Sequence, residues 1–153
     1  MKRTIFFTAL ITLMGISACN SGNQKNNING ASTSNVVSQL TNETFKKLVF
    51  NYDLNKEWKY EGNKPVIIDF YADWCPPCRQ LSPLVEEIAK EYDGKIVVYR
   101  VDTDKEKLLA QSLGITNLPT LLYIPAKGQP QVTLGYIPKE TIVKKINEFL
   151  LTK

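Results

Sequence analysis

Along the last two thirds of the chain, apolar residues form short runs with two different periods, and turn-forming residues separate these runs. Two continuous, largely β-branched runs, at 66–72 and 96–101, predict buried strands. Shorter runs at 120–124 and 131–134 predict a hairpin, because only a short, turn-rich break lies between them. Apolar residues spaced by three and four positions predict helices at about 41–50, 76–92, 104–114 and 138–151.

The predicted order of elements is α, β, α, β, α, β, β, α. The helix between the first two strands has crossover length, which implies that these strands are parallel. The stretch 51–62 is rich in turn formers and aromatic residues and is interpreted as a loop. The pattern therefore predicts an α/β fold with a mixed central sheet and helices on both faces.

The first 18 residues have the pattern of an export signal. Basic residues at positions 2 and 3 precede a mostly apolar run, 5–16, which is shorter than the roughly 20 residues needed to span a bilayer. The run ends in Ile-Ser-Ala-Cys, which resembles the lipobox of bacterial lipoproteins. We therefore expect 1–18 to be a lipoprotein signal peptide and Cys19 to carry lipid. The alternative is an ordinary signal peptide with a free thiol nearby.

Residues 19–38 form the predicted link between anchor and domain. Asn, Ser, Gly, Thr and Gln dominate this stretch, which cannot bury enough apolar surface to offset the entropy of ordering. A flexible chain of this length reaches about 25 Å. We expect a tether at 19–38 and a folded domain at 39–153, held at the cell envelope by the lipid anchor and facing the periplasm.

Charge and composition exclude several classes of function. The formal net charge is only +4, and the basic residues are scattered, so no basic face for nucleic acid is expected. The chain has no histidine, which makes His-based hydrolase triads and His-based zinc sites implausible. Of three cysteines, Cys19 is assigned to the anchor, which leaves Cys75 and Cys78 as a pair in an oxidising compartment.

The motif Trp74-Cys75-Pro76-Pro77-Cys78 lies where the first long strand meets its helix. Two intervening residues let both sulfurs meet within one helical turn. The unpaired N–H groups and the dipole of a helix N-terminus favour a thiolate, which is the attacking species in disulfide exchange. Arg79 adds a positive charge close by, and Pro76, Pro77 and Arg79 are the residues expected to tune the redox properties of the pair.

A CxxC pair has two other common uses. It can be half of a zinc site, but the domain offers no third or fourth Cys or His ligand, so no metal is expected. It can also be a purely structural disulfide, but so short a loop adds little stability by the chain-entropy argument. We therefore favour a redox-active pair.

The stretch Asp69–Arg79 resembles the active site of thioredoxins, and the resemblance covers about Gln39–Lys153. Pro83 matches the proline that kinks the active-site helix of that family. The post-tether residues, including the Trp58-Lys59-Tyr60 loop, look most like thioredoxin-like lipoproteins of the bacterial periplasm. The resemblance implies a thioredoxin fold and a protein-disulfide oxidoreductase that needs no cofactor.

The resemblance also implies roles for individual residues. Cys75 would attack the substrate disulfide, Cys78 would resolve the mixed disulfide, and the buried Asp69 would manage the proton of Cys78. The substrate would lie against residues from three separate segments: Trp74, Leu118, Pro119 and Gly135. Pro119 is expected to be a cis-proline, although a strand-start proline is the plainer interpretation; Trp74 could be ordinary core, and Asp69 could be purely structural.

One position departs from the family pattern. Thioredoxins place a lysine near the buried aspartate, and Val98 is taken to occupy the matching position. Asp69 is therefore expected to lack that counter-charge, so that burial raises its pKa. Arg100 lies two residues further on the same strand face and is the one residue that offers compensation.

The function predicted from the sequence is reduction of protein disulfides in the periplasm, with electrons from a membrane thiol donor and disulfide-containing proteins as substrates. A dedicated reductase for apocytochrome c cysteines is the alternative among enzymes. A non-catalytic binding module with the thioredoxin fold is the alternative from another class.

Overall fold

The computed structural model describes residues 36–152, and every structural statement below refers to them. The strands are β1 (Val37–Gln39), β2 (Val66–Tyr71), β3 (Val97–Asp102), β4 (Thr120–Ile124) and β5 (Gln131–Leu134). The helices are α1 (Asn42–Leu48), α2 (Pro76–Glu91), α3 (Lys107–Ser112) and α4 (Lys139–Lys145), which continues into a π-helical turn at Ile146–Leu150.

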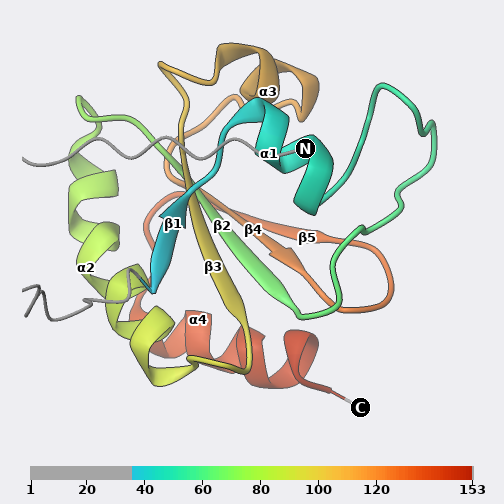
Figure 1. Ribbon diagram of the computed structural model, residues 1–153. Helices are drawn as coiled ribbons and strands as arrows, with labels where there is room; N and C mark the ends of the chain where they lie inside the picture. The colour runs from blue at the N-terminus through green and yellow to red at the C-terminus, as the bar shows by residue number, and fades with distance from the viewer. Residues whose placement is uncertain (1–35, 153) are drawn as a thin grey trace, which may run out of the picture. The chain divides into compact units, whose positions relative to one another are not determined.

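The strands form one mixed sheet in the order β1-β3-β2-β4-β5. β1, β3 and β2 are parallel, β4 is antiparallel to β2, and β5 is antiparallel to β4. Figure 1 shows α2 and α4 on one side of the sheet and α1 and α3 on the other. The predicted parallel pair, the predicted hairpin and the predicted mixed sheet with helices on both faces are confirmed.

Each face of the sheet has its own apolar core. Ile67 of β2 and Val98 of β3 pack with the apolar stripe of α2 and with α4. Their strand neighbours Ile68 and Phe70 point the other way and pack with Phe45 of α1 and with α3. The continuous apolar runs of the sequence follow from this arrangement, because a strand covered on both faces has no polar side.

The first strand was not predicted. Val37 and Ser38 were assigned to the tether, but they pair with Val98 and Tyr99 of β3 as the edge of the sheet. The folded domain therefore begins before Gln39. The strand has only 3 residues in a polar context, so its stability comes from pairing with β3 and its own sequence carries almost no signal.

Two of the predicted helix ranges differ in how well their starts agree with the structure. The helix predicted from position 41 is α1, for which Thr41 is the N-cap: its side chain accepts from the Thr44 N–H, and the Thr44 side chain accepts from the Thr41 N–H. The helix predicted from position 104 begins later, because α3 starts at Lys107. The Asp104 carboxylate instead accepts a hydrogen bond from Trp74, and residues 102–106 form a turn of their own.

The fold brings two turns together at one end of the sheet. The carboxyl end of β2 leads directly into α2, and the loop before β4 approaches it from the antiparallel side. Ligand sites of open α/β sheets commonly lie at the carboxyl ends of parallel strands. No helix between residues 36 and 152 is both long enough and apolar enough to span a bilayer.

Candidate active site

Cys75 is the N-cap of α2, and Pro76 and Pro77 fill the first two helical positions. Neither proline has an N–H, so the capping hydrogen bond comes from the Cys78 N–H, which lies 3.3 Å from the Cys75 sulfur. A thiolate formed at Cys75 would receive this hydrogen bond and the positive end of the helix dipole.

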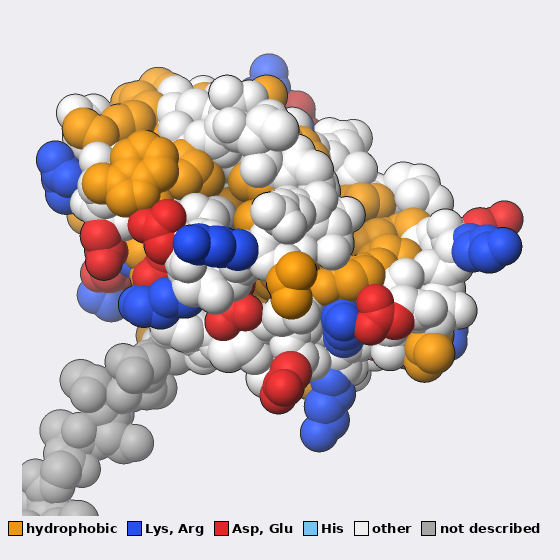
Figure 2. Space-filling model, turned by 90° about the horizontal axis from the view of Figure 1, so that it is seen from above, with side chains coloured by type: hydrophobic (Ala, Val, Ile, Leu, Met, Phe, Trp, Pro, Cys, Tyr) orange, Lys and Arg blue, Asp and Glu red, His pale blue; other side chains and the backbone are white. Residues whose placement is uncertain are grey.

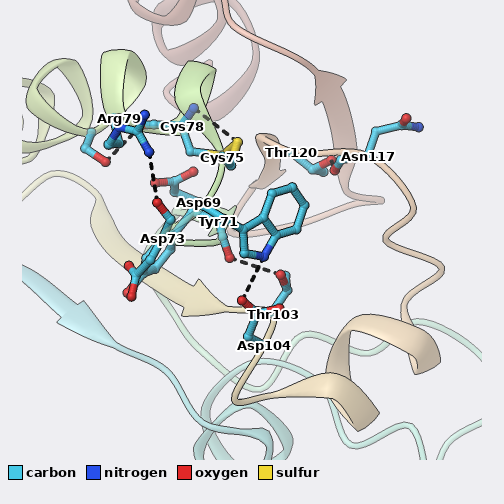
Figure 3. The surroundings of a disulfide bond; sticks show 12 residues. Asp69, Tyr71, Asp73, Cys75, Cys78, Arg79, Thr103, Asp104, Asn117 and Thr120 are labelled. Carbon is cyan, nitrogen blue, oxygen red and sulfur yellow. Dashed lines mark hydrogen bonds between the residues drawn. A yellow bond between two sulfur atoms is a disulfide. The ribbon is translucent and has the colours of Figure 1, made fainter.

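Cys75 and Cys78 form a disulfide, which closes the expected pair. Figure 3 shows this bond at the start of α2, above the end of β2. Only 2% of Cys75 and 1% of Cys78 are exposed, and Tyr71 and Leu118 pack against them. The arrangement is that of a dithiol–disulfide couple held at the end of a helix and enclosed by apolar side chains.

Trp74 lies outside the core. It is 67% exposed, and its indole N–H donates to the Asp104 carboxylate at 2.9 Å. The hydrogen bond ties the residue before Cys75 to the turn that precedes α3. Trp74 therefore presents a large apolar surface to solvent beside the disulfide, where a partner protein can reach it.

The loop before β4 is built around a cis peptide bond between Leu118 and Pro119, as expected. The Gly135 N–H donates to the Pro119 carbonyl at 2.7 Å, which draws the end of β5 to this loop. Gly135 has φ of +77°, a conformation that favours glycine, and the space where a Cβ would stand is open. Backbone is therefore accessible beside the cis-proline.

Apolar side chains also reach the surface elsewhere on the domain. Figure 2 shows hydrophobic side chains on the face seen from above, bordered by charged ones. The large exposed hydrophobic residues include two near the sequence of the site, Leu134 and Tyr136, which flank Gly135. They flank the glycine whose N–H bonds the cis-proline loop, and Trp74 precedes Cys75, so exposed apolar side chains of a kind suited to protein substrates lie on segments that form the site.

Arg79 extends over the first turn of α2 and donates from Nη1 to the Asp73 carbonyl at 3.0 Å. The residues that line a nearby pocket of about 210 Å³ include Arg79, Cys78, Ser82 and Arg100. The predicted positive charge near the pair is thus present, on the Cys78 side.

Asp69 is fully buried on β2, and its counter-charge is Arg100 of β3. Arg100 Nε donates to Asp69 Oδ2 at 3.0 Å. The two residues are direct neighbours in the parallel register, whereas Val98 stands opposite Ile67. The expectation that Val98 leaves Asp69 without a counter-charge is therefore wrong, because the position that faces the carboxylate is that of Arg100.

Burial nevertheless dominates the electrostatics of Asp69. Desolvation raises the pKa of the carboxyl group from 3.8 to about 6, against the lowering effect of the Arg100 charge and hydrogen bond. Among the residues that the structure describes, Oδ1 has no hydrogen-bond partner. Asp69 is thus poised to exchange a proton close to neutral pH, next to the disulfide-bearing turn shown in Figure 3.

Two residues of this region were not singled out in the sequence. The Ser82 hydroxyl accepts from Arg100 Nη2 at 2.6 Å and donates to the Cys78 carbonyl at 3.0 Å. The Tyr71 ring lies under the Arg100 guanidinium, with 3.9 Å between the guanidinium carbon and the ring centroid. A signal for Ser82 existed, since it follows Cys78 by one helical turn and so shares its face.

The remaining predicted site residue, Cys19, lies outside the described residues, as do the signal peptide and most of the tether. Within residues 36–152, no three His, Cys, Asp or Glu side chains come together as a metal-binding group. The chemistry that the described site offers is that of two cysteines, a buried carboxyl group and an arginine.

Comparison with known proteins gives one consistent result. A family model described as Thioredoxin matches residues 36–148. The thioredoxin of Borreliella burgdorferi is 44% identical over 110 residues, which cover 72% of this chain and 94% of that protein. The thioredoxin of Pyropia yezoensis is 38% identical over 114 residues, covering 74% and 97%. The crystal structure of chloroplastic thioredoxin z superposes with a TM-score of 0.63 at 27% identity, covering 73% and 92%.

Proposed function

Since the chain belongs to the thioredoxin family and is a thiol–disulfide oxidoreductase, we propose that it reduces protein disulfides at the cell envelope, on the periplasmic side. The observation that carries the reducing role is the Cys75 cap. The Cys75 sulfur accepts a hydrogen bond from the Cys78 N–H at the start of α2. The same hydrogen bond stabilises the Cys75 thiolate of a reduced dithiol.

The proposed reaction proceeds in two exchanges. The Cys75 thiolate attacks one sulfur of the substrate disulfide, which forms a Cys75–substrate disulfide and releases the other substrate sulfur as a thiolate. The Cys78 thiolate then attacks the Cys75 sulfur, which forms the Cys75–Cys78 disulfide and releases the second substrate sulfur. Two electrons pass from the dithiol to the substrate, and the released thiolates take up protons.

Asp69 is the proposed acceptor for the Cys78 proton in the second exchange. Its pKa of about 6 leaves the carboxylate largely ionised at neutral pH and still able to bind a proton. The substrate polypeptide would lie along the cis-Pro119 loop and the open backbone at Gly135, against the exposed face of Trp74.

The membrane location rests on the sequence. The lipobox-like residues before Cys19 and the Asn-rich stretch after it support a lipid anchor with a tether. β1 begins at the level of Ile67 and runs toward the level of Asp69, so the described chain starts away from the end of β2 that leads to the disulfide. In this proposal a membrane thiol donor returns the oxidised pair to the dithiol.

The test of the reducing role is turnover of insulin disulfides with dithiothreitol as the reductant. Wild type should accelerate reduction, and Cys75→Ser should fall to the uncatalysed rate with its fold intact by circular dichroism. In the reduced protein at neutral pH, Cys75 should also alkylate faster than Cys78, because Cys75 carries the stabilised thiolate. Equal alkylation rates, or catalysis by Cys75→Ser, would contradict the assigned roles.

The anchor has a separate test. Cys19→Ser should move the exported protein from the membrane fraction to the soluble fraction and leave insulin reduction by the purified protein unchanged. A wild-type protein that is already soluble after export would refute the lipid anchor without touching the redox proposal. Trapping of mixed disulfides on Cys78→Ala in cells would show whether the substrates are apocytochromes or a broader set of proteins.

A further inference from the structure

A chain of hydrogen bonds connects Asp69 to the backbone of Cys78. Arg100 Nε donates to the Asp69 carboxylate, and Arg100 Nη2 donates to the Ser82 hydroxyl at 2.6 Å. Ser82 in turn donates to the Cys78 carbonyl at 3.0 Å. Three elements, β2, β3 and α2, therefore meet through one guanidinium and one hydroxyl group.

Arg100 cannot move protons along this chain, because a guanidinium keeps its charge at every pH at which the protein is folded. What the chain transmits is position. The guanidinium is clamped on three sides, by the Asp69 carboxylate, the Ser82 hydroxyl and the Tyr71 ring below it. Within residues 36–152, the hydrogen bond from Arg100 to α2 is the one to Ser82.

We propose that Ser82 is a positioning residue for the release of substrate: it fixes the Arg100 guanidinium, and through it the Asp69 carboxylate, to the helical turn that carries Cys78. This inference rests on the proposed roles of Cys78 and Asp69. Ser82 touches neither the substrate nor the sulfur atoms and acts through Arg100.

The electrostatics of Asp69 depend on this clamp. Oδ1 has no hydrogen-bond partner within residues 36–152, so the charged carboxylate is supported through Oδ2 and Arg100. Without the Ser82 hydroxyl, Arg100 Nη2 loses its partner and borders a pocket of about 210 Å³ that it already lines. A guanidinium that turns toward solvent stabilises the charged carboxylate less, so the pKa of Asp69 should then rise.

Few other charges act on Asp69. On β4, the residue opposite Asp69 is the uncharged Leu121. The pocket lined by Arg100 on β3 also has titratable or charged groups from Cys78 and Arg79 on α2, and from Tyr71 at the end of β2 and Asp73 just after it. The closest charge is the one that Ser82 holds in place.

The experiment compares Ser82→Ala with wild type. Alanine suits a helix, so the variant should fold. Reduced protein is mixed with a disulfide substrate, and formation and release of the mixed disulfide are followed by stopped flow from pH 5 to pH 9. Release should slow by about three- to tenfold at pH 7, the range expected for loss of one typical intramolecular hydrogen bond. Its pH midpoint should rise by roughly half to one unit, with formation unchanged.

Two variants and one direct readout complete the test. Ser82→Thr keeps the hydroxyl and should restore the midpoint, whereas Ser112→Ala, at an exposed position of α3, should leave it unchanged. The carboxyl carbon resonance of Asp69 in the oxidised protein should titrate at higher pH in Ser82→Ala. An unchanged Asp69 titration and an unchanged midpoint would overturn the proposal, even if Ser82→Ala lowered the melting temperature. Failure of the redox roles themselves would appear separately, as catalysis by Cys75→Ser.

Discussion

Asp69 and Phe70 are adjacent on the central strand β2, equally buried, and opposite in what surrounds them. Phe70 points toward α1 and α3 into a core made of apolar side chains. Asp69 points toward α2, where it meets a guanidinium, a hydroxyl group one step further, and the turn that carries the disulfide. The face of β2 that carries Phe70 is thus purely apolar, whereas the face that carries Asp69 combines an apolar core around Ile67 with a polar network.

The two residues differ in how their burial affects the stability of the fold. Burial of Phe70 stabilises the fold at every pH, because an apolar side chain has no charge state. Burial of Asp69 raises the pKa of its carboxyl group to about 6, so the same degree of burial becomes unfavourable once the group ionises. In the proposed mechanism, this unfavourable group is the proton acceptor for Cys78.

Truncation on the apolar face should have the largest effect on stability. Phe70→Ala removes a fully buried ring from the core and should destabilise the oxidised protein by about 3–5 kcal/mol. Urea unfolding at pH 4 and at pH 8 should give the same loss, because no titratable group is involved. A loss that differs strongly between the two pH values would mean that the two faces are not independent.

On the polar face the effect should be smaller and should depend on pH. The folded-state pKa of Asp69 is raised above its unfolded value, so its contribution to stability is fully present below about pH 4 and is lost as pH rises through about 6. Asparagine does not titrate. The stability of Asp69→Asn relative to wild type should therefore increase by about 3 kcal/mol between pH 4 and pH 8, since the shift is about two units.

Urea unfolding of the oxidised proteins across that range measures this change. Asp93→Asn, at an exposed turn, is the matched control for the substitution itself. A constant difference between Asp69→Asn and wild type would show that the carboxyl group is not destabilised by burial. The same variant should slow release of substrate more than its capture, because only the second exchange needs the Cys78 proton removed.

The fold was largely predictable because both faces of β2 and β3 are covered. Because these strands are packed on both faces, their sequences are continuous, largely β-branched apolar runs. The sequence of α2 has its apolar residues at helical spacing. What the sequence could not reveal was β1, whose short polar stretch is ordered by pairing with β3. The start of α3 was also misplaced, because Asp104 bonds Trp74 across the site instead of capping its own helix.

Apart from what the family resemblance implies, the site was predictable from residue spacing only as far as its residues are close in sequence. Cys75, Cys78 and the N–H that caps Cys75 belong to one turn, so their geometry follows from the spacing alone. The partner of Asp69 depends on the register of β2 against β3, which a sequence does not give. In that register Arg100 stands beside Asp69, and Val98, two residues earlier, stands beside Ile67.

The smallest expected effect concerns the ring beneath Arg100. Tyr71→Leu removes the aromatic face that lies 3.9 Å from the guanidinium carbon, and Tyr71→Phe keeps that face while removing the hydroxyl group that accepts from Gln39. A cation–π contact of this partly buried kind contributes about 1 kcal/mol, so the leucine variant should unfold at lower urea concentration than the phenylalanine variant by that amount. The difference should persist at pH 4 and pH 8, because Arg100 stays charged throughout. Equal stabilities of the two variants would mean that Asp69 and Ser82 hold Arg100 in place through hydrogen bonds and that the aromatic ring of Tyr71 contributes nothing.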